Sequence, residues 1–358
     1  MFRQASAIGL LALFLSFSQA MAQTPKMRFE LVGNGGNCVG CEWILAEGEI
    51  APETPAAFDE FIRRHGSNTI VFNSPGGSLV AGLELGQRIR RLKMHTEVGV
   101  SRKDEFGHHE IVPGVCASAC AYAFLGGVRR SIGNMFAANK NGIERSRIGV
   151  HRFFRADALS NMDAKQFAAR DLDAEQRITA LLAVYMVTMG IDARLLGLAA
   201  EADANSMRWL TDQEIEDLRV AYDPEEFQPW AIEPYQNGAI AFTKTRNEST
   251  TISVFCRKRN EVSVLINAPG LSPDSASRLR ECSIGQENTA FGVTFPMSAV
   301  VRGPIVNGRP TLLIRLQGAP IGHDETIRFD VARACRFDFN TSKKRMAETI
   351  RLAMRNCL

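Results

Sequence analysis

The sequence lacks a strong excess of charge of either sign. Its 42 Lys and Arg residues nearly balance 39 Asp and Glu residues, which gives a formal net charge of +3 at pH 7. The basic residues are scattered along the chain, whereas proteins that bind nucleic acid concentrate them in patches. We therefore expect no nucleic-acid partner. The sequence also shows no internal repeat and no low-complexity segment.

Long apolar runs are missing too, except for a short one near the N-terminus. Residues Ile8–Phe17 form a ten-residue, mostly apolar run, about half of the roughly 20 residues that a membrane-spanning helix needs. Arg3 precedes this run, and Ala20-Met21-Ala22 follows it with the small-x-small pattern of a cleavage site. Residues 1–22 are therefore predicted to be a signal peptide cleaved after Ala22, and the protein to be periplasmic or secreted. No cysteine stands directly after the cut, so we expect no lipid anchor, and we expect no membrane span after cleavage.

Cysteines are not scarce, and in an exported chain they indicate disulfides, because that compartment oxidises thiols. The eight cysteines lie at positions 38, 41, 116, 120, 256, 282, 335 and 357. Four of them lie in the C-terminal third, and four cysteines allow three pairings. Sequence proximity favours the pairs Cys256–Cys282 and Cys335–Cys357.

The four N-terminal cysteines allow more than one interpretation. Cys38 and Cys41 favour a structural disulfide over a redox pair, because a strand rather than a helix start is predicted after them. Disulfides that fix the loop around residue 118, by cross-pairing with Cys116 and Cys120, are a second interpretation. A four-thiolate zinc site is the less favoured alternative. We expect no metal and no other cofactor.

The length of 358 residues exceeds what one hydrophobic core usually holds, so two domains are expected. Short apolar runs alternate with helical patterns over residues 42–222, which predicts a layered α/β domain. We expect strands at 42–50, 69–73, 96–100 and 148–150, and helices at 55–65, 79–92, 120–125, 163–189, 193–201 and 211–219. Prolines at 224, 229 and 234 indicate a connector over residues 223–245. Beyond it, residues 246–358 predict a small, mostly β domain with one helix at 344–355.

The stretch Asn73-Ser74-Pro75-Gly76-Gly77 lies between a predicted strand and a predicted helix. Glycine permits positive φ angles and a close approach to the backbone. Backbone N–H groups at such a turn can bind an oxyanion or a phosphate. A plain strand-to-helix turn is the alternative.

Two further stretches carry residue types used in nucleophilic catalysis. Ser118 lies among alanines in GVCASACAYAFLGG, where a loop enters a helix. The backbone N–H of Ala119 could join the glycine amides around a developing negative charge, although an N-capping serine is the common interpretation. His151 follows a short β run in IGVHRF, and neutral histidine can take the proton of a serine hydroxyl near pH 7. A structural histidine is the alternative there.

The order of these three motifs resembles the superfamily of Clp proteases and crotonases, and more closely the exported bacterial relatives of the Clp protease. The resemblance rests on Asn73–Gly77, on Ala117–Leu125 and on Gly149–Arg152, and it covers about residues 42–222. It includes the later segment RWLTDQEI, which begins at Arg208. The resemblance implies a ββα spiral fold for a serine hydrolase domain at residues 23–222. It also implies ring-shaped homo-oligomers, although the attached β domain argues against them.

Carried over by motif, the resemblance assigns Ser118 as the nucleophile and His151 as its general base. The amides of Gly77 and Ala119 would form the oxyanion hole, with Gly76 shaping the turn. Triads are defined by geometry and role, so these groups must meet in space.

The third member of the triad is where the sequence departs from the family, because Met207 stands at the aspartate position. Asp203 is the favoured replacement, and Asn205 is a second candidate. A Ser-His dyad without a carboxylate is also open. A Ser-Lys dyad would need Lys140 or Lys165.

These features together predict an exported, ATP-independent serine peptidase whose substrates are peptides or unfolded chains. The alternative of another class is a catalytically inactive Clp-protease-like fold that serves as a periplasmic binding module. An acyl-CoA enzyme of the crotonase type is disfavoured, because export removes the protein from its cofactor.

Overall fold

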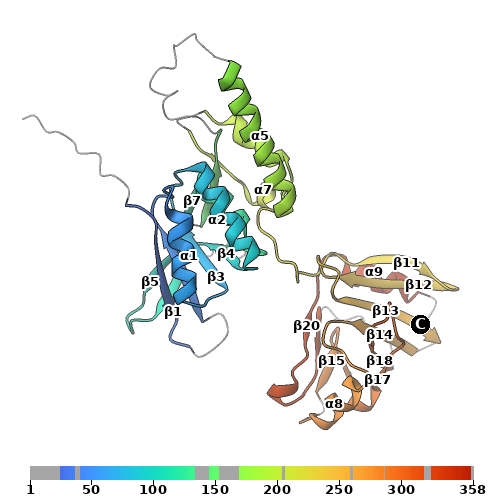
Figure 1. Cartoon of the computed structure of the whole chain (residues 1–358). Helices are drawn as coiled ribbons and strands as arrows, with labels where there is room; N and C mark the ends of the chain where they lie inside the picture. Colours follow the sequence, from blue (N-terminus) through green and yellow to red (C-terminus); the bar gives the residue numbers. More distant parts are fainter. Residues whose placement is uncertain are drawn as a thin grey trace, which may run out of the picture. The chain divides into compact units, whose positions relative to one another are not determined.

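A computed structural model describes residues 25–36, 41–133, 145–152, 169–203, 206–258, 261–285, 287–317 and 324–355 (Figure 1). The predicted signal peptide lies outside the described residues. The chain divides into two compact units. Unit 1 comprises Met1–Gly127 and Ile132–Leu218, and unit 2 comprises Val128–Ser131 and Arg219–Leu358.

The first sheet of the chain has the order β1-β2-β3-β4-β8, and its strands β1 to β4 belong to unit 1. Its strands are β1 (Arg28–Gly33), β2 (Glu42–Glu47), β3 (Thr69–Asn73), β4 (His95–Val98) and β8 (Arg129–Ile132). β2, β3 and β4 run parallel, while β1 pairs antiparallel with β2. Ile70, Val71 and Phe72 of β3 are completely buried, as expected for a parallel strand covered on both faces. The predicted α/β class of this region is confirmed.

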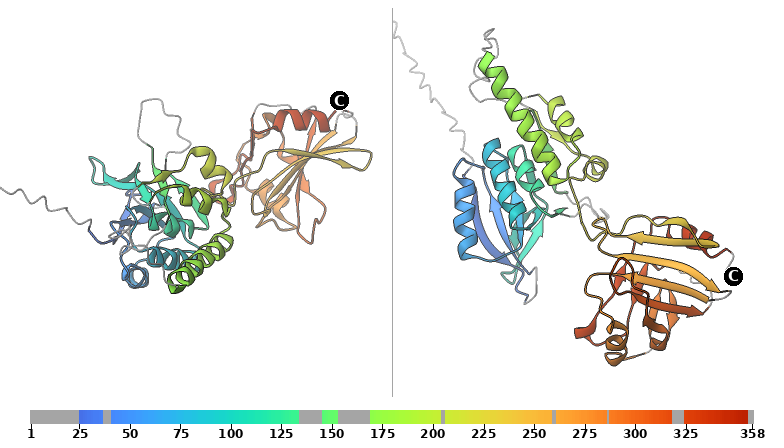
Figure 2. Two further views of the ribbon diagram at one scale, coloured as in Figure 1. Left: turned by 90° about the horizontal axis from the view of Figure 1, so that it is seen from above. Right: turned by 45° about the vertical axis from the view of Figure 1, so that its right-hand side comes forward.

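Three helices accompany this sheet, namely α1 (Thr54–Arg64), α2 (Leu79–Arg91) and α3 (Ala119–Leu125). α1 and α2 lie side by side (Figure 2). α2 and α3 touch backbone to backbone: a Cβ on Gly82 would lie 2.5 Å from the carbonyl oxygen of Ala119, and one on Gly126 would lie 2.2 Å from that of Gly86. Glycine at these places therefore sets the close approach of the two helices.

A second, three-stranded sheet has the order β10-β9-β7, formed by β7 (Val115–Ala117), β9 (Arg147–Val150) and β10 (Arg208–Trp209). A separate hairpin pairs β5 (Val100–Lys103) with β6 (His109–Val112). Further helices in the described part of this region are α5 (Ala169–Met189), α6 (Arg194–Glu201) and α7 (Asp212–Asp217). No helix within the described ranges combines the length and the apolar character that a membrane span requires.

Unit 2 contains an antiparallel six-stranded sheet in the order β11-β12-β13-β14-β18-β17 and a four-stranded sheet in the order β16-β15-β19-β20. The first sheet comprises β11 (Ala231–Tyr235), β12 (Gly238–Lys244), β13 (Thr251–Lys258), β14 (Glu261–Asn267), β17 (Val300–Arg302) and β18 (Leu312–Gln317). The second comprises β15 (Asn288–Ala290), β16 (Val293–Phe295), β19 (Thr326–Arg328) and β20 (Phe339–Asn340).

The helices of unit 2 are α8 (Ser275–Glu281) and α9 (Met346–Ala353), with single 3₁₀ turns at Met297–Ala299 and Arg333–Cys335. α9 packs on β11, β12 and β13. Trp230 and Phe291 are completely buried and meet edge to face, with their ring centroids 5.5 Å apart. Unit 2 therefore has an apolar core of its own.

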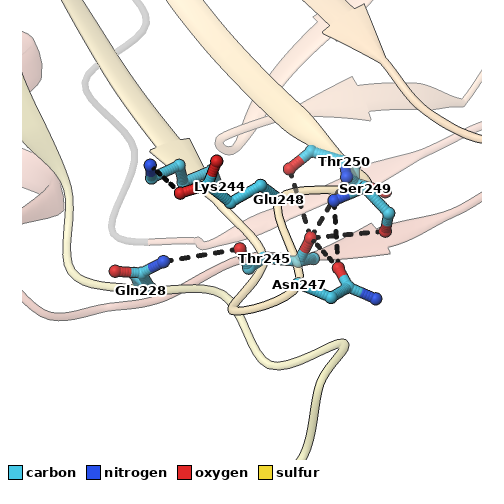
Figure 3. Close-up of polar contacts among 7 residues, drawn as sticks. All are labelled: Gln228, Lys244, Thr245, Asn247, Glu248, Ser249 and Thr250. Atoms are coloured by element: carbon cyan, nitrogen blue, oxygen red, sulfur yellow. Dashed lines mark hydrogen bonds and ion pairs between the residues drawn. The ribbon is translucent and has the colours of Figure 1, made fainter.

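The predicted connector at residues 223–245 contains two strands of unit 2 and is not a linker. β11 lies at the edge of its sheet, where Pro234 can be accommodated because an edge strand needs no ladder donor on its outer side. The stretch before it is bound to β12, since the Gln228 N–H donates to the Lys244 carbonyl at 2.8 Å. The Gln228 side chain reaches the carbonyl oxygen of Thr245, next to the polar β12–β13 turn (Figure 3).

The disulfides of unit 2 also differ from the prediction. Cys282 is bonded to Cys335, across 53 residues and with 6.2 Å between the Cα atoms, so the predicted pairs Cys256–Cys282 and Cys335–Cys357 are wrong. The Ala332 N–H donates to the Cys282 carbonyl at 2.9 Å, which brings the two segments together. A disulfide requires short Cα separation, and that is set by the fold rather than by distance along the chain.

Candidate active site

The parallel pairing of β7 with β9 brings the predicted catalytic side chains together. Ala117 is in register with Gly149, so Ser118 and His151 both follow the carboxyl ends of neighbouring strands. The Ser118 N–H donates to the Gly149 carbonyl at 2.9 Å, which extends this pairing to the serine itself. Carboxyl ends of parallel strands meet at one sheet edge, which is where ligands bind in open α/β sheets.

The Ser118 hydroxyl lies in hydrogen-bond contact with the His151 ring. Its Oγ is 2.7 Å from His151 Nε2, and the other ring nitrogen, Nδ1, is 2.8 Å from the carbonyl oxygen of Arg152. A carbonyl oxygen can only accept, so Nδ1 carries the proton in this arrangement. Nε2 is then the acceptor for the Ser118 O–H, which is the arrangement needed for a general base.

Ser118 has an unusual backbone conformation, with φ 55° and ψ −123°. Positive φ is rare for residues other than glycine, and it costs free energy that the surrounding structure must supply. Ser118 occupies the N-cap position of α3, yet its side chain makes no capping hydrogen bond. The N-capping interpretation is therefore wrong, and the hydroxyl contacts His151 instead.

Gly76, the first residue of the glycine pair, lies directly against the Ser118 turn. Gly76 and Gly77 have φ angles of 104° and 134°, which L side chains rarely adopt. A Cβ on Gly76 would lie 2.7 Å from the Ser118 Cβ and 3.0 Å from the Ala119 nitrogen. Only glycine at position 76 therefore permits this contact between the loop and the serine.

The loop is fixed to β7 by main-chain hydrogen bonds. The Ser74 N–H donates to the Val115 carbonyl at 2.8 Å, and the Ala117 N–H donates to the Ser74 carbonyl at 3.0 Å. Asn73 adds a side-chain bridge, since its Oδ1 accepts from the Val115 N–H at 3.3 Å and its Nδ2 donates to Glu47 at 2.7 Å. The glycine loop is therefore held in register with the strand that ends at the serine.

The amide of Gly76 differs in its hydrogen bonding from the two amides predicted for the oxyanion hole, those of Gly77 and Ala119. The Gly76 N–H donates to Ser74 Oγ at 3.1 Å, while the Gly76 carbonyl accepts from the Ile50 N–H at 2.7 Å. Within the described ranges, no protein group accepts a hydrogen bond from the N–H of Gly77 or of Ala119. These two amides therefore have donor capacity left for a ligand.

Asp203 is not brought to the His151 ring. Its carboxylate accepts from the Arg152 guanidinium at 2.6 Å, and Arg152 also donates to the Ala202 carbonyl at 3.0 Å. The Asp203 side chain is 86% exposed. Asp203 therefore contacts Arg152, whose carbonyl oxygen contacts the His151 ring, and does not contact the ring itself as predicted. Asn205, Lys140 and Lys165 lie outside the described residues.

A disulfide brackets the serine. Cys116, in β7, is bonded to Cys120, in α3, with 5.2 Å between the Cα atoms, and both residues are completely buried. Because these thiols are joined to each other, cross-pairing with Cys38 or Cys41 and the four-thiolate zinc site are both wrong. The described residues contain no cluster of three or more His, Cys, Asp or Glu that could hold a metal ion.

The floor below the serine is apolar and tightly packed. Every residue of α3 is buried, and the Tyr185 hydroxyl donates to the Tyr122 carbonyl at 2.6 Å. Burial raises the pKa of Tyr122 to about 12, so this phenol stays protonated at physiological pH.

Sequence reasoning missed two groups of this site, the Arg152 carbonyl and the Asn73 side chain. A main-chain carbonyl leaves no trace in an amino-acid sequence. Asn73 was visible as the first residue of the glycine motif, but nothing in the sequence indicates which strand its amide would bridge.

Comparisons with known proteins give only distant matches. No family model and no curated protein matches the chain. Among solved structures, a mutant of the 1510-N membrane-bound stomatin-specific protease is similar at 18% identity and a TM-score of 0.31, covering 49% of this chain and 75% of that chain. ClpP1 from Listeria monocytogenes is similar at 19% identity and a TM-score of 0.32, covering 50% of this chain and 88% of that chain.

A second mutant of the stomatin-specific protease, in complex with a substrate peptide, is similar at 17% identity and a TM-score of 0.31. It matches 49% of this chain and 71% of that chain.

Proposed function

We propose that this protein is an exported serine hydrolase that cleaves peptide bonds through an acyl-enzyme on Ser118, without coupling to ATP. The observation that carries the proposal is the 2.7 Å contact between Ser118 Oγ and His151 Nε2. It is made by a serine that has a positive φ angle and makes no capping hydrogen bond. Strained backbone at a nucleophile is expected where a sharp strand-to-helix turn presents a serine hydroxyl.

In the proposed reaction, Ser118 Oγ attacks the carbonyl carbon of the peptide bond while His151 Nε2 takes the hydroxyl proton. The protonated ring then gives this proton to the leaving amine as the C–N bond breaks. Water hydrolyses the resulting serine ester with the same histidine as base. The Arg152 carbonyl keeps the ring oriented through both steps by accepting from Nδ1–H.

The negative charge that develops on the substrate oxygen would be stabilised by the N–H groups of Gly77 and Ala119. The lack of protein acceptors for these two amides within the described ranges supports this role. Removing one such donor typically slows an acyl-transfer enzyme by about 10²–10³-fold. Gly76 contributes by close approach, since its own N–H is already bonded to Ser74.

Export is part of the proposal because of the predicted signal peptide at residues 1–22. ATP is absent outside the cytoplasm, so the proposed substrates are peptides and loosely folded chains that need no unfolding machine. Fractionation of cells that express the full chain, followed by N-terminal sequencing, tests this point. We expect a mature protein that begins at Gln23 and is absent from the cytoplasmic fraction.

Labelling with a fluorophosphonate tests the chemistry directly. We expect one adduct per chain, located on Ser118 by mass spectrometry, and no adduct in Ser118→Ala. Ser101→Ala is the matched control, because Ser101 also contacts a histidine ring, with its Oγ 2.8 Å from His109 Nδ1. It should label at the wild-type rate. Equal labelling of wild type and Ser118→Ala would remove the proposal.

A catalytically inactive binding module is the second candidate, and the position of Asp203 favours it. The carboxylate predicted to support His151 is bound to the Arg152 guanidinium instead, while the ring Nδ1 contacts the Arg152 carbonyl oxygen. In this case the wild type would bind peptides without cleaving them and would not label faster than Ser118→Ala. Labelling therefore decides between the two functions.

A further inference from the structure

The Cys116–Cys120 disulfide joins the residue two positions before Ser118 to the residue two positions after it. We infer that this disulfide positions Ser118, so that the oxidation state of Cys116 and Cys120 sets the reactivity of the hydrolase site. The inference rests on the proposed function, and it names a regulation of that site. Oxidised chain is competent, and reduced chain is largely latent.

The turn needs an external constraint because its conformation is unfavourable. Ser118 has φ 55°, and a non-glycine residue remains in this region only when its surroundings determine it. One side of the turn is fixed, since Cys116 lies in β7 and is in register with Ile148. The other side is the first turn of α3, which begins without a side-chain cap. The disulfide joins these two sides.

Relaxation of the turn would disturb two catalytic contacts at once. Rotation of Ser118 toward negative φ moves its Oγ away from His151 Nε2. It also turns the Ala119 N–H away from its position beside Gly76. The two lie close together at present, since a Cβ added to Gly76 would be 3.0 Å from the Ala119 nitrogen. Misplacement of reacting groups by about 1 Å can cost about 10²-fold in rate.

The two disulfides whose cysteines are both described close loops of very different length. This difference allows an effect on local positioning to be told apart from an effect on overall stability. Cys116 and Cys120 are 4 residues apart, whereas Cys282 and Cys335 are 53 residues apart. In the chain-entropy account, a disulfide stabilises a protein by restricting the unfolded chain, and it does so more for longer loops. The Cys282–Cys335 disulfide is therefore the matched control for stability, and the Cys116–Cys120 disulfide acts on local geometry.

Reduction proceeds by ordinary thiol–disulfide exchange. A dithiol such as dithiothreitol supplies two electrons and two protons, the S–S bond breaks, and Cys116 and Cys120 become thiols while the reagent becomes a cyclic disulfide. Both cysteines are completely buried, so reduction of the folded chain is slow. A newly made chain in a reducing compartment would carry thiols, and the site would become competent when that chain is oxidised after export.

The experiment compares the mature protein with Cys116→Ala/Cys120→Ala and with Cys282→Ala/Cys335→Ala. The rate constant for fluorophosphonate labelling is measured against pH, together with the final adduct number and the thermal midpoint. For Cys116→Ala/Cys120→Ala we expect labelling about 10²-fold slower at every pH, with the same pH midpoint and complete final labelling. For Cys282→Ala/Cys335→Ala we expect the wild-type rate and a lower thermal midpoint.

Hydrogen exchange of the peptide that covers residues 115–122 gives a readout that is independent of activity. Exchange should be faster in Cys116→Ala/Cys120→Ala than in the wild type. If the wild type does not label, the proposed function is wrong, and exchange alone then decides on the positioning. Equal labelling rates in wild type and variant, or unchanged exchange, would overturn the inference.

A cycle on the wild-type chain covers the case in which the double variant does not fold. Dithiothreitol should lower the labelling rate, and reoxidation with glutathione disulfide should restore it. The control variant Cys282→Ala/Cys335→Ala should show the same loss and recovery, because its Cys116–Cys120 disulfide is intact. A labelling rate that reduction does not change would contradict the inference.

Discussion

The described residues of unit 1 include two serine–histidine contacts of nearly equal distance in different surroundings. Ser118 Oγ lies 2.7 Å from His151 Nε2, and Ser101 Oγ lies 2.8 Å from His109 Nδ1. The second pair lies on the β5–β6 hairpin, where Ser101 is opposite Ile111 and His109 is two residues away on the same face. Diagonal neighbours of this kind meet on any antiparallel ribbon.

The comparison shows that two contacts of similar length can have very different backbone surroundings. Ser118 has a positive φ angle, lies against Gly76, and is followed by an amide with unused donor capacity. The hairpin offers none of this, and Phe106 at its tip is 75% exposed. What distinguishes the first pair is the preorganised backbone around it.

Replacement of the two histidines, one at a time, should reveal the largest difference between the two serine–histidine pairs. In His151→Ala we expect fluorophosphonate labelling of Ser118 to fall by about 10²–10⁴-fold, the range for loss of a general base. In His109→Ala we expect no change, because Ser101 lacks oxyanion donors. The measurement is the labelling rate constant at pH 7. A comparable loss in both variants would mean that the hairpin contributes to the site.

Replacement of a glycine should have the next largest effect. In Gly76→Ala the added Cβ would lie 2.6 Å from the Ala117 carbonyl oxygen and 2.7 Å from the Ser118 Cβ. We expect labelling to fall by about 10²–10³-fold, as for loss of an oxyanion donor. Gly107→Ala is the hairpin control, since no atom lies within 4 Å of its Cβ position. It should lower stability by about 1 kcal/mol, because Gly107 also has positive φ, and it should leave labelling unchanged.

Substitution of Asp203 should have the smallest effect on the labelling rate of Ser118. It tests whether the pair of Ser118 and His151 depends on this carboxylate. A carboxylate bound directly to a catalytic histidine is worth about 10⁴-fold in kcat. Asp203 contacts Arg152 through an exposed ion pair, and such pairs contribute little. For Asp203→Asn we therefore expect a loss of no more than about fivefold, with an unchanged pH midpoint. A loss of about 10³-fold or more would place Asp203 on the ring during the reaction.

The sequence motifs predict which side chains come together at the candidate site. Asn73–Gly77, Ser118 and His151 converge as the motifs indicate, because parallel strands place their carboxyl ends together. The contact between His151 Nδ1 and the Arg152 carbonyl could not be predicted, because a main-chain carbonyl leaves no signal in the sequence. Asp203 was the reasonable choice among side chains, and the structure places it one contact further out.

The fold was predictable in unit 1 and less so in unit 2. The strand at Thr69–Asn73 was predicted with the bounds that the structure gives, because a buried parallel strand reads as a continuous apolar run. Prolines misled the prediction at residues 223–245, since they are compatible with an edge strand as well as with a linker. Disulfide pairing failed because loops bring Cys282 and Cys335 together from distant parts of the chain.

The backbone contact between α2 and α3 has a consequence for how this protein can vary among natural relatives. α2 follows the glycine loop, α3 follows the serine, and the added Cβ atoms of Gly82 and Gly126 would overlap the neighbouring backbone. Even the smallest mutation there, a single methyl group, would wedge the two helices apart. Substitution of either glycine should therefore lower the proposed activity of Ser118. Relatives that keep the proposed reaction should keep both glycines.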